Sequence, residues 1–476
     1  MPDIKSFNVQ KIKTNTMNTL QRNNINDFKK SVKGKVILPE DSEYNETRKI
    51  WNAMIDRKPG LIVQCKNTED VIKSIHFARS NQLDLSIRGA GHNIAGSSLC
   101  DAGLVIDFST MKNVKIDAEK KHAFVEPGAT LADFDEEAQK YGLATPLGVN
   151  STTGIAGLTV GGGVGWLTKK YGLTIDNLIS LQVVTADGEK IMASESENSD
   201  LFWALRGGGG NFGVVTLFEF QLHTVGPEVL TGLFIFPHKQ AKQVLRKFHE
   251  LTVSAPEDLT VISGLRYAPP LPFLPDELVG EKIVILAAGY FGPGEKGMDL
   301  IKPLQYFGDA LGQMIAPMPY VDLQKLFDPL MTPGDRNYWK THNFIQLSDG
   351  LLDKMHEYSD RFPSQLCEIL VADLGGALNN VEPDATAWYH RDLKYLMNVH
   401  CRWQNPSEDQ RCIHWAREFF EVSKPYASAG AYVNFMTEEE NNRVKSAYGK
   451  NYDRLVEIKR KYDPENIFHN NQNIKP

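Results

Sequence analysis

The sequence predicts an α+β fold divided into two domains. Its 476 residues exceed the roughly 100–200 residues of one common domain. Short β-branched runs alternate along the chain with amphipathic runs of helical period, which favours a mixture of strands and helices. Hydrophobic side chains make up 42% of the residues and charged side chains 23%, which is typical of a chain that buries a globular core.

A change in composition near residue 226 predicts the domain boundary. Glycine is concentrated before this position, whereas proline clusters, more apolar strands and longer helices come after it. We expect a first domain over 1–226, of which 1–45 is a partly ordered tail, and a second domain over 227–426. The charged, helical segment 427–476 is expected to rejoin the first domain.

Helical periodicity and capping residues predict the helices of the first domain. A first helix is expected over 48–56, and an amphipathic run predicts a second over 68–81. A capping-box-like pattern from Thr130 to Asp133 begins a third helix, which should end at Gly142 because glycine readily adopts the left-handed conformation of a helix end.

Apolar runs bounded by turn residues predict the strands. In the first domain they cover 61–65, 85–87, 104–108, 114–116, 123–125, 181–185, 190–193 and 214–222; in the second domain they include 230–236, 283–288 and 395–403. Asp187-Gly188 lies between the runs 181–185 and 190–193, and this dipeptide is a strong signal for a β-hairpin with a two-residue turn.

Charge and composition narrow the classes of function. The chain has 52 Lys and Arg against 59 Asp and Glu, so the net charge is −7 and a basic nucleic-acid-binding face is not expected. No apolar run approaches the roughly 20 residues that span a membrane. The polar segment 1–27 does not resemble a secretory signal, so we expect a cytoplasmic protein. The five cysteines include no CxxC pair, which favours buried free thiols and no metal site.

Three glycine-rich stretches raise the question of phosphate binding; they lie at 89–96, 154–165 and 207–213. Gly208 to Gly213 formally matches the GxGxxG fingerprint of dinucleotide-binding folds. The next run, 214–222, alternates like a strand, and no carboxylate lies about 20 residues further on, so an NAD-type Rossmann site is disfavoured. Three such loops together still favour a large cofactor that carries phosphates, because glycine loops can present several backbone N–H groups to an anion.

Five motifs in order resemble a known family. They are Arg88-Gly-Ala-Gly-His92-Asn with Gly96, then 104–111, 125–129, 200–213 and 462–474. The first three are similar to the FAD-binding domain of the vanillyl-alcohol oxidase/p-cresol methylhydroxylase superfamily, and the last two to its berberine-bridge-enzyme-like branch. The resemblance runs from about residue 48 to the end of the chain. It implies an FAD-binding PCMH-type fold with a substrate domain built on an antiparallel sheet covered by helices.

This resemblance also implies which residues contact FAD. They are Arg88, Gly89, Ala90, Gly91, His92, Asn93, Gly96, Asn150, Thr153, Gly154, Gly157, Gly161, Gly162, Gly213, Val215 and Asn471. His92 is expected to bond the 8α carbon of the flavin, since a neutral imidazole is nucleophilic at one nitrogen.

The segment that follows Gly148 departs from the pattern of many relatives. Those relatives attach FAD a second time through a cysteine in a Gly-Val-Cys stretch, but here the stretch ends in Asn150. An amide cannot form the thioether, so a single histidyl link is expected. Thr153 falls where the family places a side chain that admits or blocks oxygen near the flavin.

Oxidation of an alcohol or amine requires loss of a hydride and a proton, and therefore a base within hydrogen-bond reach. The resemblance implies that such groups come from Tyr432 and Asn434 and from Asn398 and His400, two residues that share one face of a strand because side chains alternate. Tyr432 is the first candidate for acid/base or substrate anchor, although a free tyrosine has a pKa of about 10. Asn398 can orient a substrate but cannot be a base, and His400 is the second candidate. A structural role remains the alternative for both Tyr432 and His400.

We therefore expect an FAD-dependent oxidoreductase that carries its flavin on one histidine. It should take a hydride from a CH–OH carbon of a sugar or other alcohol, or from a CH–NH carbon, and be reoxidised by dioxygen with release of hydrogen peroxide. A dehydrogenase of the same fold that uses another electron acceptor is the alternative, and a non-catalytic binding module is a more distant one. The substrate and the oligomeric state are left open.

Overall fold

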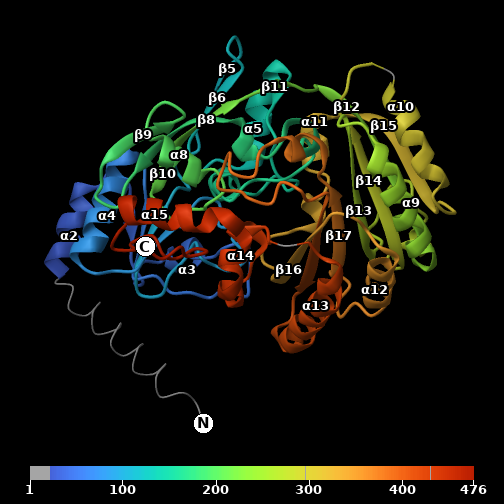
Figure 1. The fold of residues 1–476 in the computed structure, drawn as a ribbon. Coiled ribbons are helices and arrows are strands. Elements are labelled where there is room, and N and C mark those ends of the chain that lie inside the picture. The colour runs from blue at the N-terminus through green and yellow to red at the C-terminus, as the bar shows by residue number, and fades with distance from the viewer. Residues whose placement is uncertain (1–21, 295, 429) are drawn as a thin grey trace.

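The computed structural model describes residues 22–294, 296–428 and 430–476, and these form two lobes (Figure 1). One lobe contains the N-terminal half of the chain together with its C-terminal end. The other is built around a single large sheet that begins at Glu228. This arrangement agrees with the predicted fold class, while the domain boundaries at 226 and 426 stay a prediction.

The first lobe contains three sheets. In the four-stranded sheet, with order β1-β2-β4-β3, the strands β2, β4 and β3 run parallel; the five-stranded sheet, with order β5-β6-β10-β8-β9, is antiparallel, and β11 pairs with β7. The strands are β1 (Lys35–Ile37), β2 (Leu61–Gln64), β3 (Leu85–Arg88), β4 (Leu104–Asp107), β5 (Val114–Asp117), β6 (His122–Val125), β7 (Leu143–Ala144), β8 (Leu178–Val184), β9 (Lys190–Ser194), β10 (Val214–Gln221) and β11 (His223–Thr224).

Helices pack around these sheets. Those of the N-terminal half are α2 (Arg22–Ser31), α3 (Tyr44–Thr47), α4 (Thr68–Ser80), α5 (Leu131–Ala138), α6 (Ile155–Val160), α7 (Thr168–Tyr171) and α8 (Ser199–Leu205), and the chain end adds α14 (Val444–Tyr448) and α15 (Tyr452–Tyr462). The capping box at the start of α5 is confirmed, with both reciprocal hydrogen bonds between Thr130 and Asp133. The β8–β9 hairpin is confirmed as well, with Gly188 in the left-handed region at φ +79°.

One prediction for the start of the chain is wrong. Residues 48–56 are not a helix, because the segment is held by tertiary bonds instead: Trp51 N–H donates to Gly91 O at 3.1 Å, and Asn52 Nδ2 donates to Ile94 O at 3.1 Å. The described part of the predicted tail, 22–45, contains α2, β1 and the start of α3, and the expectation of a partly ordered tail over 1–45 stays a prediction. The rest of that tail, 1–21, lies outside the described residues.

The second lobe is a seven-stranded antiparallel sheet with order β15-β12-β14-β13-β17-β18-β16. Its strands are β12 (Glu228–Pro237), β13 (Leu259–Tyr267), β14 (Lys282–Tyr290), β15 (Gly312–Pro319), β16 (Arg336–Phe344), β17 (Glu368–Asp373) and β18 (Tyr395–Trp403). Its helices are α9 (Ala241–Ser254), α10 (Lys296–Ile301), α11 (Tyr320–Gln324), α12 (Asp349–Asp360) and α13 (Asp409–Ser423). Helices α9, α12 and α13 cover the outer face over a shared apolar core, and the inner face looks towards the first lobe (Figure 1). The predicted sheet covered by helices is therefore confirmed.

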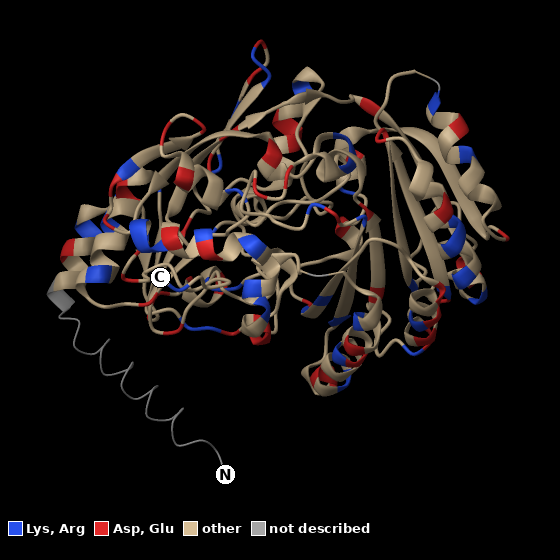
Figure 2. Ribbon diagram, in the orientation of Figure 1, with Lys and Arg blue, Asp and Glu red and all other residues tan. Residues whose placement is uncertain are grey.

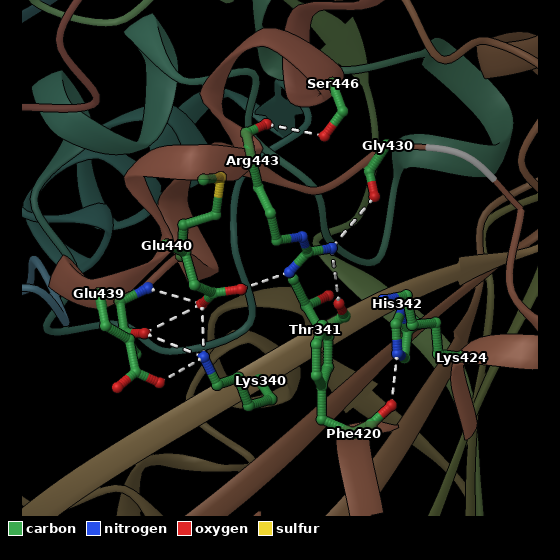
Figure 3. A network of polar contacts seen from close by, with 12 residues as sticks. Lys340, Thr341, His342, Phe420, Lys424, Gly430, Glu439, Glu440, Arg443 and Ser446 are labelled. Atoms are coloured by element: carbon green, nitrogen blue, oxygen red, sulfur yellow. Dashed lines mark hydrogen bonds and ion pairs between the residues drawn. The ribbon is translucent and has the colours of Figure 1, made fainter. Parts of the chain in front are cut away.

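The C-terminal segment returns from α13 to the first lobe and is anchored on the way by a buried charge network (Figure 3). Lys340 Nζ on β16 lies 2.8 Å from Glu439 Oε1 and 3.2 Å from Glu440 Oε2. Arg443 pairs with Glu440 and donates to Gly430 O at 3.3 Å. We call residues 430–443 the strap. The network ties the strap to the large sheet beside the place where Tyr432 enters the interior.

Charged side chains of both signs are interspersed over the peripheral helices, whereas the strands of the large sheet carry few of them (Figure 2). Within the described residues, no helix combines the length and the apolarity that crossing a membrane requires. All five cysteines are buried free thiols, as predicted. The described part of the chain also contains no cluster of His, Cys, Asp or Glu suited to a metal ion.

Candidate active site

A cavity of about 340 Å³ lies between the two lobes, within the usual range of ligand pockets. Sixteen of the residues singled out in the sequence line it: Gly89, Ala90, Gly91, His92, Asn93, Asn150, Thr153, Gly154, Gly157, Gly213, Val215, Asn398, His400, Tyr432, Asn434 and Asn471. Among the described residues, none of its lining side chains is Asp, Glu, Lys or Arg. The cavity is therefore uncharged at its surface, and polar only at selected points.

Four predicted FAD-contact residues do not line this cavity. The guanidinium of Arg88 is bound instead to the buried carboxylate of Asp107, with Nη2 and Oδ2 2.6 Å apart. Gly96 lies in a turn with φ +77°. Gly161 and Gly162 support the strap, because a Cβ at Gly161 would lie 2.2 Å from Asn434 Oδ1, closer than atoms can pack. These four residues therefore have structural roles outside the lining of the cavity.

Several polar groups of the cavity lack protein partners. Within the described part of the chain, four buried atoms of its lining residues make no hydrogen bond: Ser98 Oγ, Asn150 Nδ2, Asn398 Oδ1 and Asn471 Oδ1. In the loop after β3, the backbone N–H groups of residues 90–93 donate to no described protein group. Since buried polar groups are normally satisfied, these atoms indicate where a polar ligand binds. The N–H groups of one loop suit an anion.

His92 lies in that loop, with its ring against Trp51 at a centroid distance of 5.0 Å and an interplanar angle of 24°. Its Nε2 is 2.8 Å from Thr152 Oγ1, and its Nδ1 is 3.5 Å from Thr153 Oγ1. Burial lowers the pKa of His92 to about 3. The imidazole is therefore neutral across the physiological range and keeps one nitrogen with a free lone pair.

Tyr432 enters the cavity from the strap, before the short 3-10 turn Val433–Phe435. Its hydroxyl oxygen accepts two hydrogen bonds, one from Gly163 N–H at 3.2 Å and one from Asn434 Nδ2 at 3.0 Å. Burial raises the pKa of Tyr432 to about 12. The hydroxyl thus stays protonated at neutral pH, and its own proton is left to donate. The structural alternative of a cross-strand tyrosine does not apply, since Tyr432 is not on a strand.

His400 on β18 forms a buried pair with Glu368 on β17, the residue directly opposite it in the antiparallel register. Its Nδ1 lies 2.9 Å from Glu368 Oε1, and Arg266 Nη1 holds the other carboxylate oxygen at 2.6 Å. Burial by itself raises the pKa of Glu368, but Arg266 and His400 outweigh it and hold that pKa at about 2. Burial also lowers the pKa of His400. A neutral His400 donates its Nδ1–H to the carboxylate, which leaves Nε2 as the accepting nitrogen.

The other members of this face follow the predicted alternation. Leu396, Asn398 and His400 all line the cavity from β18. Trp339 on the neighbouring β16 stacks on His400, with ring centroids 4.1 Å apart and an interplanar angle of 19°. The catalytic candidates from two distant parts of the sequence therefore line one cavity.

The sequence analysis missed several residues of the site. Glu368 and Trp339 were missed because only the strand register places them beside His400. Trp51 was assigned to a helix, although it lines the cavity. Thr152 was passed over, yet its position in the same short loop as Asn150 and Thr153 was the available signal.

Two family models match the chain. One, for an FAD binding domain, covers residues 59–194, and the other, "Berberine and berberine like", covers residues 431–475. The second match contains most of the strap and its four cavity-lining residues, Tyr432, Val433, Asn434 and Phe435.

Curated relatives match over nearly the whole length. An FAD-linked oxidoreductase of Dictyostelium discoideum is 34% identical over 95% of this chain and 97% of its own. The chain belongs to the berberine-bridge-enzyme-like FAD-linked oxidoreductases. The (R)-6-hydroxynicotine oxidase of Paenarthrobacter nicotinovorans is 31% identical over 94% of this chain and 97% of its own. The solved structure of 6-hydroxy-D-nicotine oxidase from Arthrobacter nicotinovorans has a TM-score of 0.83 at 28% identity, covering 94% of this chain and 98% of that one.

The residues of this FAD-linked oxidoreductase fit its cofactor. The free N–H groups of residues 90–93 suit the pyrophosphate, and the unpaired amide groups of Asn150 and Asn471 suit polar edges of a large ligand. Gly157 and Gly210 border open space, since a Cβ at either would meet nothing within 4 Å. Both line the cavity, so the backbone can approach a flat ring system closely there.

Proposed function

We propose that this FAD-linked oxidoreductase removes a hydride from a carbon that carries a hydroxyl or amino group in a small, uncharged molecule. FAD is attached at His92 alone, and dioxygen is the electron acceptor. The observation that carries the proposal is the His400–Glu368 pair, which presents a neutral imidazole to the same uncharged cavity as His92. When bound, FAD supplies the acceptor for the hydride.

The proton of the reaction goes to His400. As the substrate O–H or N–H loses its proton to Nε2, the ring becomes an imidazolium beside the Glu368 carboxylate at 2.9 Å, which stabilises the new charge. Tyr432 is the anchor rather than the base, because its pKa of about 12 keeps the hydroxyl protonated and able to donate. Asn398 orients the substrate through its unpaired Oδ1.

The lining supports an uncharged substrate with apolar surface. Aromatic and aliphatic side chains make up much of the cavity lining: Trp51, Ile262, Phe327, Met331, Trp339, Leu370 and Phe435. A charged group placed among them would lose its hydration without an ion partner, at a cost of several kcal/mol. The relative named (R)-6-hydroxynicotine oxidase supports a small-molecule substrate.

An anaerobic screen tests the proposal. Purified protein is mixed without oxygen with a panel of sugars, aromatic alcohols and amines, and bleaching of the oxidised flavin absorbance is followed. We expect at least one uncharged alcohol or amine to bleach it, and air to restore the colour rapidly. The absence of bleaching by every member would contradict the proposed reaction. Slow recovery in air that a quinone accelerates would instead favour the alternative dehydrogenase.

A further inference from the structure

We propose that Asn150 and Thr152 are positioning residues that hold His92 in the tautomer protonated at Nε2, so that Nδ1 is the nitrogen that bonds FAD. This inference rests on the proposed attachment of FAD to His92. It concerns only side chains that the structure places in contact: the amide of Asn150, the hydroxyl of Thr152 and the imidazole of His92.

The first step is the orientation of the Asn150 amide. Its Oδ1 lies 3.1 Å from the backbone nitrogen of Thr152 and 2.6 Å from Thr152 Oγ1. A backbone N–H can only donate, so the amide atom that it meets must be the oxygen. The amide is therefore oriented by its surroundings, with Nδ2 turned away towards the cavity, where it has no partner among the described residues.

The second step is the single proton of the Thr152 hydroxyl. Because Asn150 Oδ1 accepts only, the hydroxyl must donate its proton to it. Towards His92, at 2.8 Å, Thr152 Oγ1 can then only accept. His92 Nε2 must consequently carry the ring proton. The burial that lowers the pKa of His92 to about 3 rules out a second proton on Nδ1 near neutral pH.

The third step is the state of the other ring nitrogen. Nδ1 keeps its lone pair, and its nearest recorded partner, Thr153 Oγ1, is 3.5 Å away, too far for a strong hydrogen bond. Stacking against Trp51 restricts rotation of the ring. The contacts with Thr152 and Trp51 thus hold the ring so that Nδ1 is free to form a bond.

Attachment of FAD to His92 is a two-electron oxidation in which all atoms and electrons are accounted for. One C–H bond of the 8α methyl group and the N–H bond of the imidazole break, and one C–N bond forms at Nδ1. The imidazole proton leaves from Nε2. Dioxygen, the electron acceptor of the proposed function, takes up the two electrons and two protons and leaves as hydrogen peroxide. Asn150 stands where relatives with two links carry cysteine, so the same position here orients the first link instead of making a second.

A set of variants of the full-length protein tests the inference. Protein is produced with riboflavin limiting, FAD is added, and the flavin in acid-precipitated protein is followed over time as a share of the total bound flavin. Thr152→Val removes the hydroxyl and keeps the branched shape; we expect attachment about tenfold slower, the effect of one lost hydrogen bond. Thr152→Ser keeps the hydroxyl that links Asn150 to His92 and should attach FAD at the rate of the unchanged protein. Asn150→Ala should be slowed like Thr152→Val.

A matched control comes from the same lobe. Thr159 is buried, its hydroxyl has no partner among the described residues, and it does not line the cavity. Thr159→Val should therefore leave the attachment rate unchanged. If Thr152→Val binds as much FAD as the unchanged protein and attaches it equally fast, the inference is overturned.

A second measurement separates the inference from the proposed function. In ¹⁵N-histidine-labelled apoprotein, NMR reports which ring nitrogen of His92 is protonated, and the signal is assigned by its loss in His92→Gln. We expect a protonated Nε2 and a bare Nδ1 in the unchanged protein, and a mixture in Thr152→Val. A protonated Nδ1 in the unchanged protein overturns the inference that Asn150 and Thr152 set the tautomer of His92. Acid-precipitated protein without any flavin would instead contradict the proposed attachment. The tautomer measured by NMR would still show whether Asn150 and Thr152 orient His92.

Discussion

Two histidines line the cavity, His92 from the first lobe and His400 from the large sheet, and they differ in what holds them. His92 is held through a neutral hydroxyl, with Nε2 2.8 Å from Thr152 Oγ1. His400 is held through a carboxylate, with Nδ1 2.9 Å from Glu368 Oε1. Opposite ring nitrogens are therefore left free, Nδ1 of His92 and Nε2 of His400.

The difference suits two different tasks. A ring with neutral partners gains nothing from protonation, and burial lowers the pKa of His92 to about 3, so it remains a nucleophile. A ring beside Glu368 can accept a proton, because the carboxylate stabilises the imidazolium. Under the proposed function, the same kind of side chain serves as an attachment point at His92 and as a base at His400, and the partner of each ring accounts for the difference.

The largest effect is expected from removal of the base. His400→Gln should lower the anaerobic rate of flavin reduction by roughly 10²–10⁴-fold, the usual contribution of general base catalysis. Covalent attachment at His92 should proceed as in the unchanged protein. Stopped-flow spectroscopy measures the rate of flavin reduction, and flavin in acid-precipitated protein measures attachment. Equal losses in both would contradict separate roles for His400 and His92.

Weakening the contacts between the strap and the large sheet should lower the stability of the protein. Lys340→Met removes the β16 cation that contacts both Glu439 and Glu440, while Arg443 still pairs with Glu440, so we expect the free energy of unfolding to fall by about 2 kcal/mol. Urea unfolding checks this value. Lys354→Met, which breaks an exposed pair with Glu357, is the control and should change stability little. A comparable loss in both variants would contradict a special role for the network.

The charge of Glu368 should set the pH range of the base. The carboxylate raises the pKa of His400 against the effect of burial, while Arg266 and Arg402 lower it. Glu368→Gln removes the negative charge beside the ring, so the pKa of His400 falls. The acid limb, that is the loss of flavin-reduction rate as the base becomes protonated at low pH, then moves to lower pH. The rate on the plateau should fall about tenfold, since a weaker base removes the proton more slowly.

Asp373, at the other end of β17, provides the matched control for this change. It is equally buried and pairs with Lys169, with Oδ2 and Nζ 2.6 Å apart, but it does not line the cavity. Asp373→Asn should lower stability and leave the acid limb where it was. An unmoved acid limb in Glu368→Gln would show that the carboxylate has a structural role only.

The smallest effect is expected from the anchor. Tyr432→Phe removes one hydrogen-bond donor to the substrate and should slow flavin reduction about fivefold, mainly through weaker substrate binding. Because the pKa of Tyr432 is about 12, the hydroxyl does not titrate in the acid range, and the acid limb should not move. A loss as large as that of His400→Gln would make Tyr432 the base after all.

Sequence reasoning predicted best where a structure is determined locally. The capping box of Thr130 and Asp133 and the hairpin at Asp187-Gly188 depend on residues within four positions of one another, and both are present. The rejection of a Rossmann site also held, since a strand rather than a helix follows Gly213. The fold family followed from five such local motifs in order.

The pairs that explain the site depend on distant parts of the chain. Glu368 meets His400 through strand register across 32 residues, and no local pattern announces this pairing. The segment around Trp51 has helical periodicity, yet hydrogen bonds to Gly91 and Met331 fix it in an irregular path. Tertiary contacts overrode local preference there.

Peptide mass spectrometry of the purified protein tests the central claim most directly. We expect the proteolytic peptide that contains His92 to be heavier by one FAD, with fragmentation placing the added mass on the histidine, and the peptide that contains Asn150 to carry no addition. An unmodified His92 peptide from flavin-containing protein would contradict the account.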